Sequence, residues 1–100
     1  MNRFGEHIKL LREQKGLLQR QVAIQLDIDT PMLSKIERGE RNAKREQVAM
    51  LSNYFEVTEN QLISLWLADK VFEVVKDEPA ALKALEVTEN EVKRLKKNNK

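Results

Sequence analysis

The stretch LLQRQVAIQLDIDTPMLSKIERG, residues 17–39, carries the local signals that decide the fold. Its second half opens with Asp29, whose carboxylate can accept hydrogen bonds from the free amides of a first helical turn. Pro31 fits into that turn, because the amide that it lacks would have no partner there. Gly39 tolerates the left-handed conformation in which many helices end. These signals predict a helix that begins at Thr30 and stops at this glycine.

Apolar residues recur with helical spacing on both sides of this helix. The other predicted helices span residues 3–15, 19–26, 44–55 and 58–76. Thr58, followed three residues later by Gln61, has the pattern of a capping box. The pattern recurs at Thr88, which predicts a further helix start. Pro79 in a first turn predicts a short helix between the helix that follows Thr58 and the start at Thr88. The expected fold class is all-α.

The composition limits the chain to one small domain. One hundred residues with 41% hydrophobic content cannot form two independent cores. No cysteine is present, which excludes a disulfide framework, a thiolate zinc site and a thiol nucleophile. The apolar runs are too short for a membrane span and the first residues are unlike a secretory signal, so we expect a cytoplasmic protein.

We expect no catalytic, metal or cofactor site. The sole histidine, His7, has no partner histidine at metal-ligand spacing. The sequence also lacks a nucleophile with a nearby base and a phosphate-binding loop. An enzyme is therefore the least favoured class.

The net charge of +2 conceals an uneven distribution. Residues 1–55 carry 10 Lys and Arg against 7 Asp and Glu, whereas residues 56–100 carry 8 against 9. The excess is concentrated between Lys35 and Arg45, where five cations accompany two carboxylates. Most charge runs of this size are ordinary solvated surface. This one lies beside the helix predicted at Thr30, as a phosphate-binding surface would.

The most specific motif is LSKIERG, residues 33–39, with the frame LLRE…KG…Q…A at matching spacing upstream. In these residues the chain resembles the helix-turn-helix family of Xre, Cro and phage-repressor proteins, over roughly its first 65 residues. The resemblance implies a lambda-repressor-like bundle. Three features depart from the family pattern: Asp27 replaces a usual glycine, Leu18 a usual capping Ser or Thr, and Ala43-Lys44-Arg45 a Pro-Ser-Leu type segment.

The resemblance also implies that the helix predicted at Thr30 is the recognition helix, which enters the major groove of DNA. Its residues expected to face DNA bases are Thr30, Pro31, Ser34 and Lys35. A lysine can donate to guanine O6 and N7, and a hydroxyl group can bond either kind of base edge. Pro31 and Met32 have no strong donor, so one of them contacts a thymine methyl or shapes the helix end.

Other residues are suited to positioning. Gln19 matches a family position that contacts a phosphate and braces the recognition helix. The full set expected at backbone phosphates, which carry no sequence information, is Gln19, Arg20, Arg38, Arg41, Asn42 and Lys44. Arg12 and Glu37 match a family pair that forms an internal salt bridge, so Glu37 is excluded from base readout.

The helix predicted after Thr58 is too apolar to be covered by its own domain. Such a surface indicates an interaction site, and we expect a second copy of the chain on it. The expected dimer interface is Leu62, Leu65, Trp66, Phe72 and Val75. Alternatively, residues 80–85 and 92–95 fold back and cover the helix within one chain.

The expected organisation is a DNA-binding domain over residues 1–57 and a helical dimerisation extension over residues 58–100, with a basic tail that frays. Together these features predict a dimeric, sequence-specific transcription regulator. Two-fold symmetry would place its recognition helices in successive major grooves of a roughly palindromic operator. With no room for an effector-binding domain, its activity would follow its concentration.

Several readings of the biological role stay open. The resemblance favours a restriction-modification controller over a short phage repressor. The alternative class is an antitoxin or adaptor that uses the same fold mainly for protein–protein interaction. Double-stranded DNA and a second copy are the expected partners, RNA polymerase or a toxin are further candidates, and a membrane is not expected.

Overall fold

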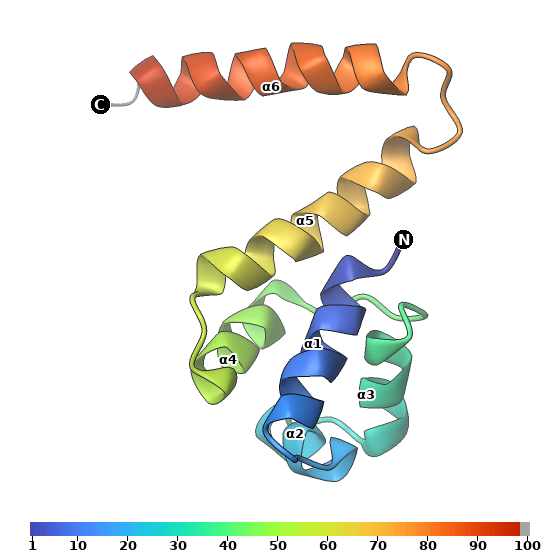
Figure 1. The fold of residues 1–100 in the computed structure, drawn as a ribbon, viewed down its shortest axis with the longest axis vertical. Helices are drawn as coiled ribbons and strands as arrows, with labels where there is room; N and C mark the ends of the chain where they lie inside the picture. The colour runs from blue at the N-terminus through green and yellow to red at the C-terminus, as the bar shows by residue number, and fades with distance from the viewer. Residues whose placement is uncertain (99–100) are drawn as a thin grey trace. The chain divides into compact units, whose positions relative to one another are not determined.

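The computed structural model describes residues 1–98, which contain six helices and no strand. The helices are α1 (Arg3–Gln14), α2 (Gln19–Gln25), α3 (Thr30–Glu37), α4 (Arg45–Phe55), α5 (Glu59–Val75) and α6 (Ala81–Asn98), as Figure 1 shows. The predicted all-α class is confirmed, and α1 to α5 begin and end close to their predicted positions. No helix in this range is both long and apolar enough to span a membrane.

The chain divides into two compact units, Met1–Lys70 and a second that begins at Val71. The first unit contains α1 to α4 and most of α5, and it encloses the hydrophobic core. The second contains the end of α5 and all of α6. The buried apolar residues are Phe4, Ile8, Val22, Ala23, Leu26, Leu33, Ile36, Ala43, Val48, Leu51, Phe55, Leu62 and Ile63.

Two helix starts use the predicted capping side chains. Asp29 Oδ1 accepts a hydrogen bond from the amide of Met32 at 2.8 Å, so α3 begins at Thr30 as predicted. Before α5, Thr58 Oγ1 accepts from the Gln61 amide at 3.2 Å, and Gln61 Oε1 accepts from the Thr58 amide at 3.3 Å. This reciprocal pair is the predicted capping box.

Two other helices begin without a capping Ser, Thr or Asp. In front of α2, the amide of Leu18 donates to Gln21 Oε1 at 2.7 Å. In front of α4, the amide of Lys44 donates to Gln47 Oε1 at 2.8 Å. Each glutamine supplies the returning half of a capping box. A glutamine three residues after the cap position is therefore the signal that compensates for the missing hydroxyl.

Four helices end on a residue in the left-handed conformation. These residues, with φ between 55° and 78°, are Gly16, Asp27, Gly39 and Glu56. After α2, the amide of Ile28 donates to the carbonyl of Ala23 at 3.1 Å, which is the hydrogen bond of a Schellman motif. Asp27 thus adopts the conformation of the glycine that it replaces, at a cost that glycine would not have.

α1 and α3 approach each other closely at Gly5. A Cβ atom on this residue would lie 2.4 Å from the carbonyl oxygen of Ile36 and 2.7 Å from that of Glu37. Only glycine permits this separation. The close approach sets the position of the last turn of α3 against α1.

A carboxylate from α5 caps the start of α1. Asp69 Oδ1 accepts from the amide of Arg3 and Asp69 Oδ2 from the amide of Phe4, both at 2.9 Å. Asn2 adds a third acceptor, because its Oδ1 binds the amide of Gly5 at 3.2 Å. The free amides of the first turn of α1 are thereby satisfied partly by a residue remote in sequence.

The predicted dimer interface on α5 needs correction. Leu62 is completely buried in the core of its own chain, so its assignment to a subunit interface is wrong. Leu65 and Trp66 are half-buried and pack against the same core, because the first half of α5 completes the first unit. Phe72 is exposed and Val75 half-buried. Further exposed apolar side chains on α5 are Leu67, Val71 and Val74.

The end of the chain also differs from the prediction. α6 is one helix from Ala81 to Asn98, where the sequence predicts a short helix and a new start at Thr88. Thr88 lies inside α6 and its Oγ1 donates to the carbonyl of Ala84 at 2.8 Å, so it does not cap. The basic end that is predicted to fray is helical as far as Asn98, and residues 99–100 lie outside the described part.

Candidate nucleic-acid interface

α3 turns one face to the core and leaves the opposite face open. Leu33, Ile36 and Glu37 are buried on the inner face. The four residues expected at DNA bases lie elsewhere on the helix: Pro31 and Lys35 are exposed, and Thr30 and Ser34 are half-buried. The helix therefore presents Lys35 as its exposed charged donor, with Pro31 one turn earlier.

A buried ion pair holds α3 against α1. Arg12 Nε donates to Glu37 Oε2 at 2.7 Å, and a second guanidinium nitrogen donates to Oε1 at 3.2 Å. The side chain of Glu37 is only 2% exposed and that of Arg12 12%. The hydrogen bond to Glu37 raises the pKa of Arg12, against the opposing effect of burial. This is the pair that the resemblance implies, and its bidentate geometry fixes the rotation of α3.

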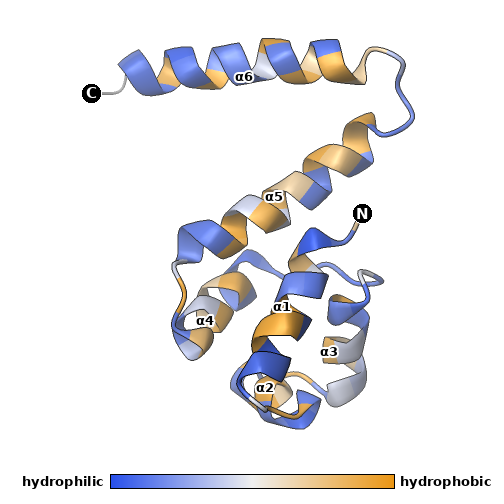
Figure 2. Ribbon diagram, viewed as in Figure 1, coloured by the Kyte–Doolittle hydropathy of each residue, from blue (hydrophilic) through white to orange (hydrophobic). Residues whose placement is uncertain are grey.

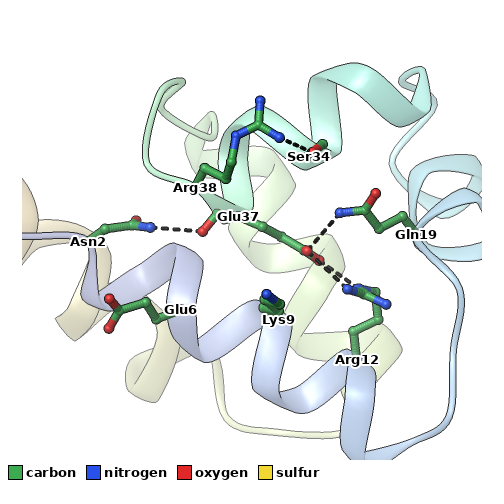
Figure 3. A pocket seen from close by; sticks show the side chains of 8 residues that line it. All are labelled: Asn2, Glu6, Lys9, Arg12, Gln19, Ser34, Glu37 and Arg38. Carbon is green, nitrogen blue, oxygen red and sulfur yellow. Dashed lines mark hydrogen bonds and ion pairs between the residues drawn. The ribbon is translucent and has the colours of Figure 1, made fainter.

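Gln19 and Leu17 extend this network. Gln19 Nε2, at the start of α2, donates to Glu37 Oε1 at 2.9 Å, and Arg12 also donates to the carbonyl of Leu17 at 2.9 Å. Figure 3 shows the side chains of Arg12 and Gln19 both directed at the Glu37 carboxylate. One carboxylate thus connects α1, α2 and α3. The side-chain amide of Gln19 braces α3, which is half of the double role expected for it.

Asn2 fixes the far end of α3. Its Nδ2 donates to the backbone carbonyl of Glu37 at 2.8 Å. Gly39 lies so close that a Cβ atom there would be 2.6 Å from Asn2 Cγ. The residue before α1 therefore anchors the turn that follows α3. Sequence reasoning missed Asn2, although an asparagine directly before a predicted helix was available as a capping signal.

Ser34 and Arg38 contact each other on the open side of α3. Arg38 donates to Ser34 Oγ and also forms an ion pair with Glu40. Both members of the ion pair are more than half exposed, so the contact is weak and can be exchanged for a phosphate. The Ser34 hydroxyl proton is not used in this contact.

The other residues expected at phosphates are exposed near α3. Arg20 is exposed on α2, and Arg41, Asn42 and Lys44 are exposed in the segment that leads to α4. Within residues 1–98, none of Arg20, Lys35, Arg41 and Lys44 takes part in an ion pair. Their charges are available to an anionic ligand.

Trp66 anchors the segment between α3 and α4. Its indole Nε1 donates to the carbonyl of Ala43 at 2.8 Å, and Ala43 itself is buried. Lys70 lies over the Trp66 ring, 4.4 Å from its centroid. The sequence predicts Trp66 at a subunit interface, but its polar atom holds the backbone between two of the exposed phosphate candidates, Asn42 and Lys44.

An open hollow lies between α1 and α3, and Figure 3 shows its lining. The lining residues are Asn2, Glu6, Lys9, Arg12, Gln19, Ser34, Glu37 and Arg38. Its lining contains both positive and negative side chains, and the Glu37 carboxylate is already bound by Arg12 and Gln19. Among the described residues, no group of three or more His, Cys, Asp or Glu side chains could hold a metal ion. The hollow therefore combines the buried groups that hold α3 with Ser34 and Arg38 from its open side.

The sequence of this chain is similar to those of known proteins. Residues 3–65 match a family model described as a helix-turn-helix domain. The chain is 36% identical over 63 residues to the control protein C.MunI of Mycoplasma sp, covering 62% of this chain and 85% of that relative. It is also 36% identical over 61 residues to the HTH-type transcriptional activator BcrR of Enterococcus faecalis, covering 61% of this chain. The chain spans only 30% of the length of BcrR.

Proposed function

The chain belongs to the helix-turn-helix family, as an Xre-like member related to restriction-modification controllers, and we propose that it is a dimeric regulator of transcription that binds a specific, roughly palindromic DNA operator. One observation carries the proposal: α3 is held rigidly by the Arg12, Glu37 and Gln19 network while its outer face and the cations beside it are open. Such a helix can enter the major groove without rearrangement of the core.

The chemistry of each side chain determines whether we assign it to a base or to a backbone phosphate. Lys35 donates to guanine, and Thr30 and Ser34 bond to base edges once Arg38 has turned to a phosphate. Pro31 contacts a thymine methyl or shapes the helix end. Backbone phosphates are bound by Gln19, Arg20, Arg38, Arg41, Asn42 and Lys44.

The small size of this readable surface supports the dimer. Few base-reading groups on one α3 select a short sequence, whereas two copies read two half-sites about 34 to 36 Å apart. The exposed apolar side chains Val71, Phe72 and Val74 on α5 are suited to the contact between copies. The similarity to a control protein favours a cytoplasmic controller or autoregulator whose occupancy follows its own concentration.

Selection of binding sites from a random duplex library, with the full chain, tests the proposal. We expect enrichment of a sequence with two-fold symmetry, and an affinity that falls steeply with salt. Weak binding without sequence preference would contradict it and would favour an adaptor or an antitoxin.

Lys35→Ala sharpens this test. Without the lysine's bond to guanine, binding to the selected site should weaken by about 1 to 3 kcal/mol, and the preference at one position of each half-site should relax. Fluorescence anisotropy with the selected site and its single-base variants measures both effects. If affinity for random DNA fell by the same factor, Lys35 would bind a phosphate instead of a base.

A further inference from the structure

Residues of low polarity follow one edge of α6 with alternating spacings of four and three. They are Ala81, Leu85, Thr88, Val92 and Leu95, which occupy the d, a, d, a and d positions of a heptad repeat. α6 contains no buried residue, and Leu85, Val92 and Leu95 are 36%, 45% and 60% exposed. Figure 2 shows apolar and polar residues alternating along this helix. An edge of this kind matches another helix with the same repeat.

The charges beside the edge select the partner and its direction. Glu91 occupies a g position and Lys96 the e position five residues later. In a parallel pair of identical helices, Glu91 of each copy faces Lys96 of the other, so two attractive pairs form. In an antiparallel pair with Thr88 of one copy beside Val92 of the other, Glu91 instead faces Glu91. The charges therefore favour a second copy of the same helix, running in the same direction.

The contacts within one chain leave these charges free to pair. Lys96 forms no ion pair among residues 1–98, and Glu91 pairs only with Arg94, at 3.0 Å and on a highly exposed surface. Exposed pairs of this kind are readily exchanged. Val92 at an a position and Leu95 at a d position are also the combination that favours two-stranded coiled coils.

We propose that α6 pairs with α6 of a second copy as a short, parallel, two-stranded coiled coil. The proposal rests on the dimeric function proposed above and adds a contact outside residues 3–65, the part that matches the helix-turn-helix family. Little more than two heptads are too short to hold two chains alone. The coiled coil therefore acts together with the exposed apolar residues of α5.

Two valines of α6 provide a matched test in the full chain. Val92 lies on the a/d edge, and Val87, which is 52% exposed, lies at an outward c position. In analytical ultracentrifugation, Val92→Glu should raise the dimer dissociation constant at least about a hundredfold, because it places two carboxylates inside the pair. Val87→Glu should leave it within about a factor of three. Equal effects of the two substitutions would overturn the proposal.

Two neighbouring lysines test the charge pairing. Lys96→Glu places a carboxylate opposite Glu91 of the other copy in both pairs, so the dimer should weaken about fivefold. The same change at Lys97, which points outward, should have little effect. Adding Glu91→Lys to Lys96→Glu restores opposite charges and should restore the dissociation constant. Failure of this restoration would reject the parallel pairing.

The direction can be tested by cross-linking, because the chain has no cysteine of its own. In a parallel pair the two copies of residue 88 meet at a d layer, so Thr88→Cys should form an interchain disulfide under mild oxidation. Asn90→Cys, at an outward f position, should not. Cross-linking of Asn90→Cys in preference to Thr88→Cys would overturn the proposed register.

The two proposals fail in different ways. If Val92→Glu leaves the dimer intact while Phe72→Glu dissociates it, the coiled coil is wrong and the dimeric regulator stands. If the unsubstituted chain is a monomer that binds single half-sites, both the coiled coil and the dimeric mode of action are wrong.

Discussion

Asp27 ends α2 in a left-handed conformation with φ of 55°. An L-residue is strained there and glycine is not, so Asp27→Gly should raise the free energy of unfolding by about 0.5 to 1 kcal/mol. Asp27→Ala should lower it, because alanine lacks the short polar side chain that eases this conformation for aspartate. Urea unfolding followed by circular dichroism measures both. A lower stability of the glycine variant would show that the carboxylate has a stabilising contact.

The buried carboxylate of Glu37 connects α3 to both Arg12 and Gln19. Glu37→Gln removes the charge that compensates a guanidinium only 12% exposed, and it should cost about 3 kcal/mol of stability. Glu13 is the matched control, since it lies 3.9 Å from the same arginine but is 55% exposed. Glu13→Gln should change stability by less than about 0.5 kcal/mol. Similar losses for the two variants in urea unfolding would contradict the role of burial.

At the level of elements, α5 is joined to α1 by the capping carboxylate of Asp69. Asp69→Ala leaves the amides of Arg3 and Phe4 without this acceptor and should destabilise the first unit by about 1 to 2 kcal/mol. Asp77→Ala, in the exposed segment after α5, makes the same chemical change without a cap and should be near neutral. Amide hydrogen exchange should show reduced protection at the start of α1. Unchanged protection there would argue against the cap.

The helices themselves were largely predictable, because their starts depend on side chains a few residues apart. Asp29 and Thr58 predict the starts of α3 and α5, and in the structure both side chains accept the expected capping hydrogen bonds. Thr88 has the same local pattern and caps nothing, since the helical periodicity continues on both sides of it. A capping motif therefore predicts a helix start only where the preceding residues do not favour a helix.

At the scale of the whole molecule, the exposed cations around α3 should determine how binding depends on salt. Lys44→Ala should weaken binding to all DNA sequences alike and lower the slope of log K against log salt by about 0.9 for each phosphate that is no longer neutralised, or nearly two in a dimer. Lys83→Ala removes the same charge from the second unit and should leave the slope unchanged. Titrations at several salt concentrations measure both. A shared change of slope would indicate a general effect of net charge.

The sequence by itself determined the helical class, the position of the helix that begins at Thr30, the cationic segment beside it and the resemblance to a regulator family. These properties follow from residues close together in the chain, where capping, periodicity and charge act locally. The tertiary structure decided which of the apolar residues of α5 remain on the surface. Leu62 and Leu67 are equally apolar in sequence, yet the first is buried and the second is 45% exposed.

The structure also decided which distant residues hold α3 and its surroundings in place. Asn2 and Gly5 contact the last turn of α3, Trp66 binds the segment that follows it, and Asp69 caps α1, against which α3 packs. Each of these partners is between 23 and 66 positions away in the chain. No local pattern encodes such partners, because they meet only when the helices pack around the core. The side chains proposed to read DNA can thus be identified from the sequence of α3, whereas the contacts that hold this helix in place come from packing.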